Sequence, residues 1–192
     1  MASLFPFLLF GGLGLFLVIY NNLKQKRAPY YWESPLDRAI PFMPASVVFY
    51  FLYFPLIVGT FFALRESVFE IGFLAATNLS LYLSLIVYYF FPSTIRRPTL
   101  HEGRRRDVFE SVVALMYRVD RTTNGFPSAH VYVTVICGYY LMLAFPAAAW
   151  PLWVLAGAII TSTTLVKQHY VIDIVGGILW GLGAIAVVNW IF

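Results

Sequence analysis

Long apolar stretches alternate with shorter polar segments along the whole chain. Six of these stretches come close to the length that a helix needs to cross the hydrocarbon core of a bilayer, about 20 residues. They occupy residues 4–20, 44–64, 71–91, 128–145, 151–166 and 170–192. The pattern predicts an all-α membrane protein built as a bundle of six transmembrane helices.

The longest polar segment, residues 92–127, carries a second kind of pattern. Within residues 107–119 apolar residues recur at helical intervals, and charged residues occupy the other side. The apolar residues are Val108, Phe109, Val112, Val113, Met116 and Val119. One-sided spacing of this kind is typical of a helix that lies in the membrane interface. We therefore expect an interfacial amphipathic helix between the third and fourth spans.

The composition supports the membrane class and limits the partners. Hydrophobic residues make up 60% of the chain and charged residues only 11%, and no second domain is apparent within residues 1–192. The single cysteine, Cys137, excludes a disulfide within the chain and a cysteine-based metal cluster. The net charge is +4, but the basic residues flank the predicted spans. This placement suits anionic lipid headgroups rather than nucleic acid.

The distribution of basic residues predicts an orientation. Six spans place both chain ends on one side of the membrane and three loops on the other. Those loops, residues 21–43, residues 92–127 and the junction around Lys167, hold every lysine and arginine except Arg65. The positive-inside rule then places these loops in the cytoplasm. We expect an integral protein of the inner cell membrane with its polar loops on the cytoplasmic side.

The start of the last span contains the first candidate for chemistry. Residues 167–173 read Lys-Gln-His-Tyr-Val-Ile-Asp, so His169 and Asp173 are four residues apart and share one face of a helix. A carboxylate there can accept the N–H of the imidazole, fix its tautomer and leave the other nitrogen free to react. Ionisable groups at membrane depth are costly, so this pair indicates a functional site.

A second candidate opens the fourth span. Residues 125–130 read Gly-Phe-Pro-Ser-Ala-His, where Ser128 suits a helix N-cap and His130 lies in the first turn. The backbone amides around Ser128 and Ala129 at such a helix start favour an anion. If the fourth and sixth helices are neighbours, a phosphate held there would lie between His130 and His169. One histidine could attack the phosphorus while the other protonates the leaving oxygen.

Cations near these histidines would neutralise the phosphate oxygens. Arg96, Arg97 and Lys167 are the first candidates for that role. Asp173 is the only acid within a predicted span, so we expect neither a metal site nor a cofactor.

These motifs together resemble a known family. The run Pro-Ser-Ala-His at 127–130, then Ser162 and His169-x-x-x-Asp173, is similar to the second and third signature blocks of the type 2 phosphatidic acid phosphatase (PAP2) superfamily. Arg97-Pro98 fits the end of the first block, Lys-x6-Arg-Pro. The resemblance implies that His169 is the nucleophile that forms a phosphohistidine, that Asp173 orients it and that His130 is the general acid.

The chain departs from the signature at two cations. The lysine of the first block falls at Phe90 and the arginine of the third block at Thr163. Lys167, Arg96 and Arg121 are the nearest substitutes. The run Asn-Gly-Phe-Pro-Ser-x-His at 124–130, taken with residues 167–173, is closer to the branch that contains the inositol phosphorylceramide and sphingomyelin synthases.

Three functions follow as hypotheses. The first is a membrane phosphatase that hydrolyses a lipid phosphate or pyrophosphate, such as a phosphatidate-, isoprenoid- or phosphatidylglycerophosphate-like substrate. The second is a lipid phosphotransferase of the inositol phosphorylceramide or sphingomyelin synthase type, in which a lipid alcohol takes the place of water. The third is a non-catalytic transporter or scaffold for anionic lipids.

Overall fold

The computed structural model describes residues 5–23, 28–100, 107–120 and 122–192. Within these ranges the regular secondary structure is helical, without a β-strand. The elements are α1 (Phe5–Leu23), α2 (Pro35–Ala39), η1 (Pro44–Ser46), α3 (Val47–Phe51), α4 (Tyr53–Leu64), α5 (Glu70–Phe90), α6 (Val108–Val119), α7 (Ala129–Ala144), η2 (Pro146–Ala148), α8 (Ala149–Leu165) and α9 (Val171–Ile191). The prediction of an all-α protein is confirmed for the described residues.

Four helical segments are long and apolar enough to cross a membrane. They are Pro44–Leu64, Glu70–Phe90, Pro146–Leu165 and Val171–Ile191. Two shorter apolar segments are also present, Gly11–Leu23 within α1 and Ala129–Ala144 of α7. The chain is therefore an integral membrane protein by the length and composition of these helices, and the count of six spans stays a prediction.

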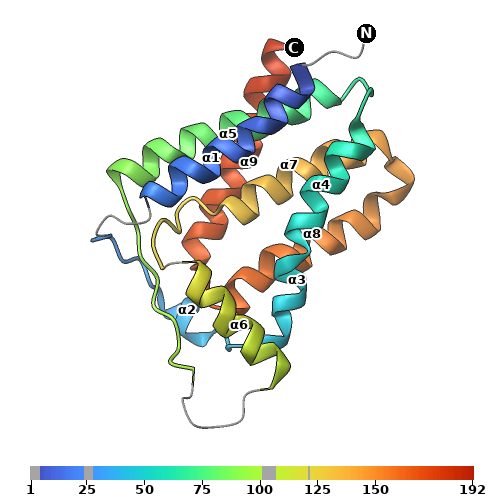
Figure 1. The fold of residues 1–192 in the computed structure, drawn as a ribbon. Helices are drawn as coiled ribbons and strands as arrows, with labels where there is room; N and C mark the ends of the chain where they lie inside the picture. The colour runs from blue at the N-terminus through green and yellow to red at the C-terminus, as the bar shows by residue number, and fades with distance from the viewer. Residues whose placement is uncertain (1–4, 24–27, 101–106, 121) are drawn as a thin grey trace.

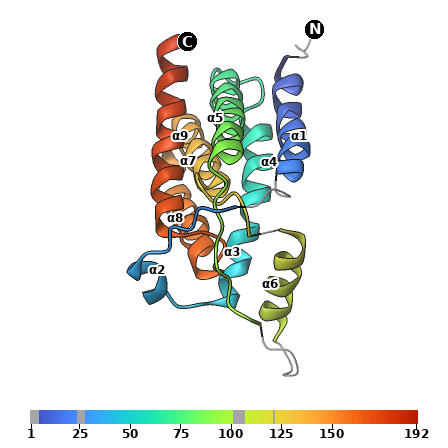
Figure 2. The same ribbon diagram turned by 90° about the vertical axis from the view of Figure 1, so that its left-hand side faces the viewer.

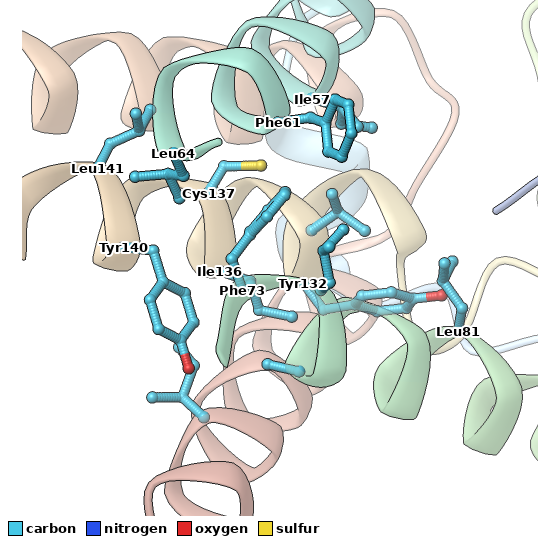
Figure 3. Close-up of a cluster of buried hydrophobic side chains, with 14 of the residues drawn as sticks. Ile57, Phe61, Leu64, Phe73, Leu81, Tyr132, Ile136, Cys137, Tyr140 and Leu141 are labelled. Carbon is cyan, nitrogen blue, oxygen red and sulfur yellow. The ribbon is translucent and has the colours of Figure 1, made fainter. Parts of the chain in front are cut away.

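Helix α7 lies at the centre of the bundle and contacts α4, α5, α8 and α9 (Figure 1). Figure 3 shows its buried side chains, including Tyr132, Ile136 and Tyr140, meeting Phe73 of α5 and Phe61 of α4. Because lipid tails are as apolar as these side chains, the close van der Waals packing of the large side chains is what holds the helices around α7 together in a membrane.

Two glycines let α9 approach α7 closely. A Cβ at Gly177 would lie 2.7 Å from the Cβ of Val131, and a Cβ at Gly181 would lie 2.9 Å from the carbonyl oxygen of Tyr132. Small residues at such positions allow two membrane helices to pack with their backbones near each other. This close packing brings the starts of α7 and α9, and hence the two histidine motifs, to the same place.

The segment Pro44–Leu64 is not one continuous helix. Helix α3 ends at Phe51 and α4 begins at Tyr53, so the helix is interrupted at Leu52. Pro55 explains the break, because a proline has no N–H to donate to the carbonyl four residues earlier, and its ring crowds that carbonyl. The interruption lies beside the site described below.

Helices α2 and α6 lie at one end of the bundle, opposite the start of α1 and the end of α9 (Figure 2). Asp107 caps α6, because its Oδ1 accepts a hydrogen bond of 2.7 Å from the backbone N–H of Glu110. Val113 and Met116 of α6 are buried beside Val47 and Tyr50. A helix thus forms where the sequence pattern predicted one, and its position in the membrane interface stays a prediction.

Candidate active site

His169 and Asp173 lie side by side at the start of α9. The Nδ1 atom of His169 is 3.4 Å from Oδ2 of Asp173, and the exposed fractions of the two side chains are 10% and 2%. Catalytic hydrogen bonds are often this long before a substrate binds. The same Oδ2 atom accepts a hydrogen bond of 2.9 Å from the backbone N–H of Tyr170. Asp173 therefore both caps its own helix and faces the imidazole.

The start of α7 is joined directly to the start of α9. The backbone N–H of Ser128 donates a hydrogen bond of 3.2 Å to the carbonyl oxygen of Asp173. A Cβ at Gly125 would lie only 2.9 Å from Oδ2 of Asp173, so a larger residue at this position would displace the carboxylate. Ser128 and Asp173, which are 45 positions apart in the chain, thus bring the two sequence motifs into one structural unit.

His130 and His169 face each other across this unit. Their ring centroids are 5.9 Å apart, a separation on the scale needed for a phosphorus atom about 3–3.5 Å from an attacking nitrogen. The rings of Tyr50 and Tyr53, on either side of the helix break at Leu52, lie 4.4 and 4.3 Å from the His130 ring. The sequence expectation that the two histidines meet agrees with this geometry.

Both histidines line an apolar cavity of about 510 Å³. Its walls come from α1, the α3–α4 junction, α5 and α6, and they include Phe16, Phe54, Leu81 and Leu115. Ala129, named from the sequence as a phosphate contact, lines the same cavity. A cavity of this size and lining suits an elongated apolar ligand whose polar end lies at the histidines.

Arg97 connects α6 to the segment that carries His169. Its guanidinium donates to the carbonyl oxygens of Tyr117 (3.2 Å) and Asp120 (2.7 Å), and to Oε1 of Gln168. It also lies 4.4 Å from the centroid of the Tyr117 ring. Burial lowers the pKa of Arg97, and the nearby charge of Asp120 opposes that effect. Whether this residue also contacts a phosphate stays a prediction.

Lys167 is bound to a different part of the chain. Its ammonium donates to the carbonyl oxygens of Asp37 (3.0 Å) and Ile40 (2.5 Å), at the end of α2. Burial lowers the pKa of Lys167, and Asp37 opposes the shift. We interpret Lys167 as the residue that holds α2 against the site. Its expected role, to replace the arginine that the signature has at the position of Thr163, stays a prediction.

Asp37 is a site residue that the sequence analysis did not identify. It is buried, its Oδ1 accepts a hydrogen bond of 2.7 Å from the N–H of Val171, and its Oδ2 accepts one of 2.7 Å from the N–H of Ser34. One carboxylate thereby caps α2 and also binds the first residue of α9. The Ser-x-x-Asp spacing at 34–37 indicated a helix cap, but nothing in it indicated the contact with Val171.

A second, smaller cavity of about 270 Å³ also has His169 in its lining. It is lined by Arg38, Arg96, Arg97 and Lys167 among others. The backbone N–H of Arg96 donates a hydrogen bond of 2.9 Å to the hydroxyl of Tyr170, whose pKa is raised by burial. His169 thus lines both the apolar cavity and this one, which is basic on balance because its four cations outnumber Glu33 and Asp37. Arg121, the remaining cation named from the sequence, lies outside the described residues.

Comparison with known proteins identifies the family. The family model of the PAP2 superfamily matches residues 39–187, a range that runs from the end of α2 into α9 and contains His130, His169 and Asp173. No curated protein sequence and no solved structure shows significant similarity to the chain. Because the model covers well over half of the residues, the protein belongs to the PAP2 superfamily.

Proposed function

We propose that the protein hydrolyses a lipid phosphate or pyrophosphate through a phosphohistidine on His169. The observation that carries this proposal is the pair of facing histidines at the polar end of an apolar cavity. Membership of the PAP2 superfamily supports phosphatase or phosphotransferase chemistry on lipid phosphates. Phosphatidate-, isoprenoid- and phosphatidylglycerophosphate-like lipids are the substrate classes to be tested.

The proposed first step is attack on phosphorus. Nδ1 of His169 lies 3.4 Å from Oδ2 of Asp173, so in this proposal the carboxylate draws the imidazole proton to Nδ1 and leaves the lone pair on Nε2 for the new N–P bond. As the P–O bond to the lipid breaks, His130 gives its proton to the leaving oxygen. The positive end of the α7 helix dipole favours the negative charge on the remaining oxygens.

The second step releases the phosphate. A water molecule loses a proton to His130 and attacks the phosphorus, the N–P bond breaks, and its electron pair returns to Nε2 of His169. Inorganic phosphate leaves, and both histidines regain their starting protonation states. The basic cavity beside His169 offers a path for this anion, because Arg38 and Arg96 line it.

The same cavity favours a second candidate function. Its polar lining next to His169 could hold a phosphorylated headgroup while a lipid alcohol, in place of water, attacks the intermediate. That reaction is the one expected for a lipid phosphotransferase of the inositol phosphorylceramide or sphingomyelin synthase type.

Purified protein tested against a panel of lipid phosphates and phospholipids distinguishes the two functions. We expect release of inorganic phosphate from at least one lipid phosphate, and no release by a His130→Ala variant. Formation of a new phospholipid without free phosphate would favour the phosphotransferase. Neither product from any lipid in the panel would contradict both enzymes and favour a transporter or scaffold.

Narrowing the apolar cavity should weaken the binding of long-chain substrates. Leu115 of α6 lines the cavity and is 61% exposed, so a Leu115→Trp substitution can narrow the cavity without disturbing the core. We expect the KM for a long-chain lipid phosphate to rise about fivefold to tenfold, the equivalent of about 1–1.4 kcal/mol. The measurement is steady-state kinetics in mixed micelles.

Val108 provides the matched control on the same helix. It is 76% exposed and does not line the cavity, so Val108→Trp adds the same surface elsewhere on α6. Its KM should equal that of the wild-type protein. Equal KM values for both tryptophan variants would show that this cavity does not hold the lipid chain.

A further inference from the structure

Several buried polar groups close to the two histidines have no hydrogen-bond partner among the residues that the structure describes. They are both side-chain atoms of the Asn124 amide, Nε2 of Gln168 and Oγ of Ser128. The exposed fractions of these residues are 3%, 3% and 0%. Asn124 and Gln168 also line the apolar cavity together with His130 and His169. Asn124 and Gln168 therefore lie where the polar end of a ligand would bind, and Ser128 is buried directly before Ala129, which lines the same cavity.

Buried polar groups without a hydrogen-bond partner destabilise the folded protein unless a ligand forms hydrogen bonds with them. A buried donor or acceptor without a partner costs about 1–3 kcal/mol, and the great majority of such groups in folded proteins are paired. Exchanging the side-chain oxygen and nitrogen of Asn124 would still leave both atoms unpaired, because neither position has a hydrogen-bond partner. A ligand that accepts hydrogen bonds would remove this cost.

Backbone requirements explain only part of this arrangement. Asn124 has a φ of 65°, a conformation that asparagine tolerates better than most residues, and its N–H donates to the carbonyl of Ser93 at 2.7 Å. These facts favour asparagine or glycine at position 124. They do not require a buried amide, since glycine would satisfy the backbone without one.

Gln168 is oriented by Arg97. The guanidinium donates to Oε1 of Gln168, which fixes that end of the amide and leaves its NH₂ group as the unpaired end. A positive charge on the carbonyl side also polarises the amide and strengthens its N–H groups as donors. Arg97 can thus favour a nearby anion through Gln168, while its Nη1 and Nη2 groups donate to protein oxygens.

We propose that Asn124 and Gln168 join Ser128 in binding the non-bridging oxygens of the substrate phosphate. Amide and hydroxyl donors are well matched to phosphate oxygens, and the last torsions of asparagine and glutamine side chains turn easily. This set of neutral donors supplies hydrogen bonds in a chain that has Phe90 and Thr163 where the family signature has cations. The inference rests on the proposed function for the identity of the ligand, a phosphoryl group.

Isosteric substitutions test the proposal by changing charge with little change in shape. Asn124→Asp keeps a residue that tolerates the positive φ, and Gln168→Glu keeps an oxygen for Arg97. Each replaces an N–H donor with a negative oxygen. We expect each to weaken the binding of inorganic phosphate by about tenfold or more, measured by isothermal titration calorimetry on the detergent-solubilised protein.

Ser80 supplies the control. Its hydroxyl is also buried and has no partner among the described residues, but it lies in the middle of α5 and does not line the cavity. Ser80→Ala should leave the affinity for phosphate unchanged. Wild-type affinity in Asn124→Asp and Gln168→Glu would overturn the proposal, and so would a wild-type protein that binds no phosphate.

The binding measurement separates this inference from the proposed function. Phosphate binding that depends on Asn124 and Gln168, without turnover of any lipid phosphate, would support the binding site and contradict the phosphatase. Turnover of a lipid phosphate with undiminished phosphate binding in both variants would support the phosphatase and contradict the binding site.

Discussion

Replacement of His169 by alanine is expected to abolish turnover of the lipid phosphate, with a loss of at least about 10⁴-fold in kcat. The substitution removes the nitrogen that forms the N–P bond, and in other enzymes the loss of a nucleophile lowers kcat by about 10⁶-fold. Phosphate release from mixed micelles measures the rate. His169 is part of a loop rather than of the core, so the melting temperature should change little.

The second imidazole makes a useful comparison for that variant. His130→Ala removes the proton donor but leaves the nucleophile in place, so an aryl phosphate whose leaving group needs no proton should still react with His169. His169→Ala should be inactive towards the same compound. Full activity of His169→Ala towards any phosphate ester would make the nucleophile assignment wrong.

Asp173→Asn is expected to lower kcat by about 10⁴-fold with little change in KM. The asparagine oxygen can still accept the N–H of Tyr170, so the cap of α9 is kept. The same oxygen position also faces Nδ1 of His169, so what the substitution removes is the negative charge that stabilises the imidazole as it becomes positively charged during the attack. The equivalent substitution in the serine-protease triad has an effect of that size.

The measurement for this variant combines kinetics with thermal unfolding. Asp173→Ala removes the cap as well as the orienting group, so it should lower both kcat and stability, by about 0.5–2 kcal/mol for the cap. Asp173→Asn should lower kcat alone. A kcat near that of the wild-type protein in Asp173→Asn would show that Asp173 serves only to cap the helix.

The sequence was most informative about features that depend on interactions between residues close together in the chain. The helix at Val108–Val119 follows from its one-sided spacing and its Asp107 cap. Helix α7 begins directly after Ser128, where the sequence predicted its start, but the Ser128 side chain makes no capping hydrogen bond. The meeting of His130 with His169 needed only that two helices be neighbours, and Gly177 and Gly181 provide the close approach. The number of spans and their orientation depend on a membrane and stay predictions.

Contacts between residues far apart in the chain could not be predicted from the sequence pattern. Asp37 binds the N–H of Val171, 134 positions later, and Lys167 binds carbonyl oxygens at Asp37 and Ile40. A lysine near a phosphate site is a natural candidate for an anion ligand from its charge alone. Only its partners in three dimensions indicate that it holds α2. The buried amides of Asn124 and Gln168 were likewise recognisable only once their missing partners were known.

The central claim is that a phosphoryl group becomes bonded to His169. Its most direct test is a rapid alkaline quench of the His130→Ala variant with an aryl phosphate, followed by mass spectrometry of the peptide that contains His169. Because the second step then lacks its base, phosphohistidine should accumulate on His169 and be absent from His169→Ala. Turnover of the aryl phosphate without an adduct at His169, or with an adduct on another residue, would contradict the claim.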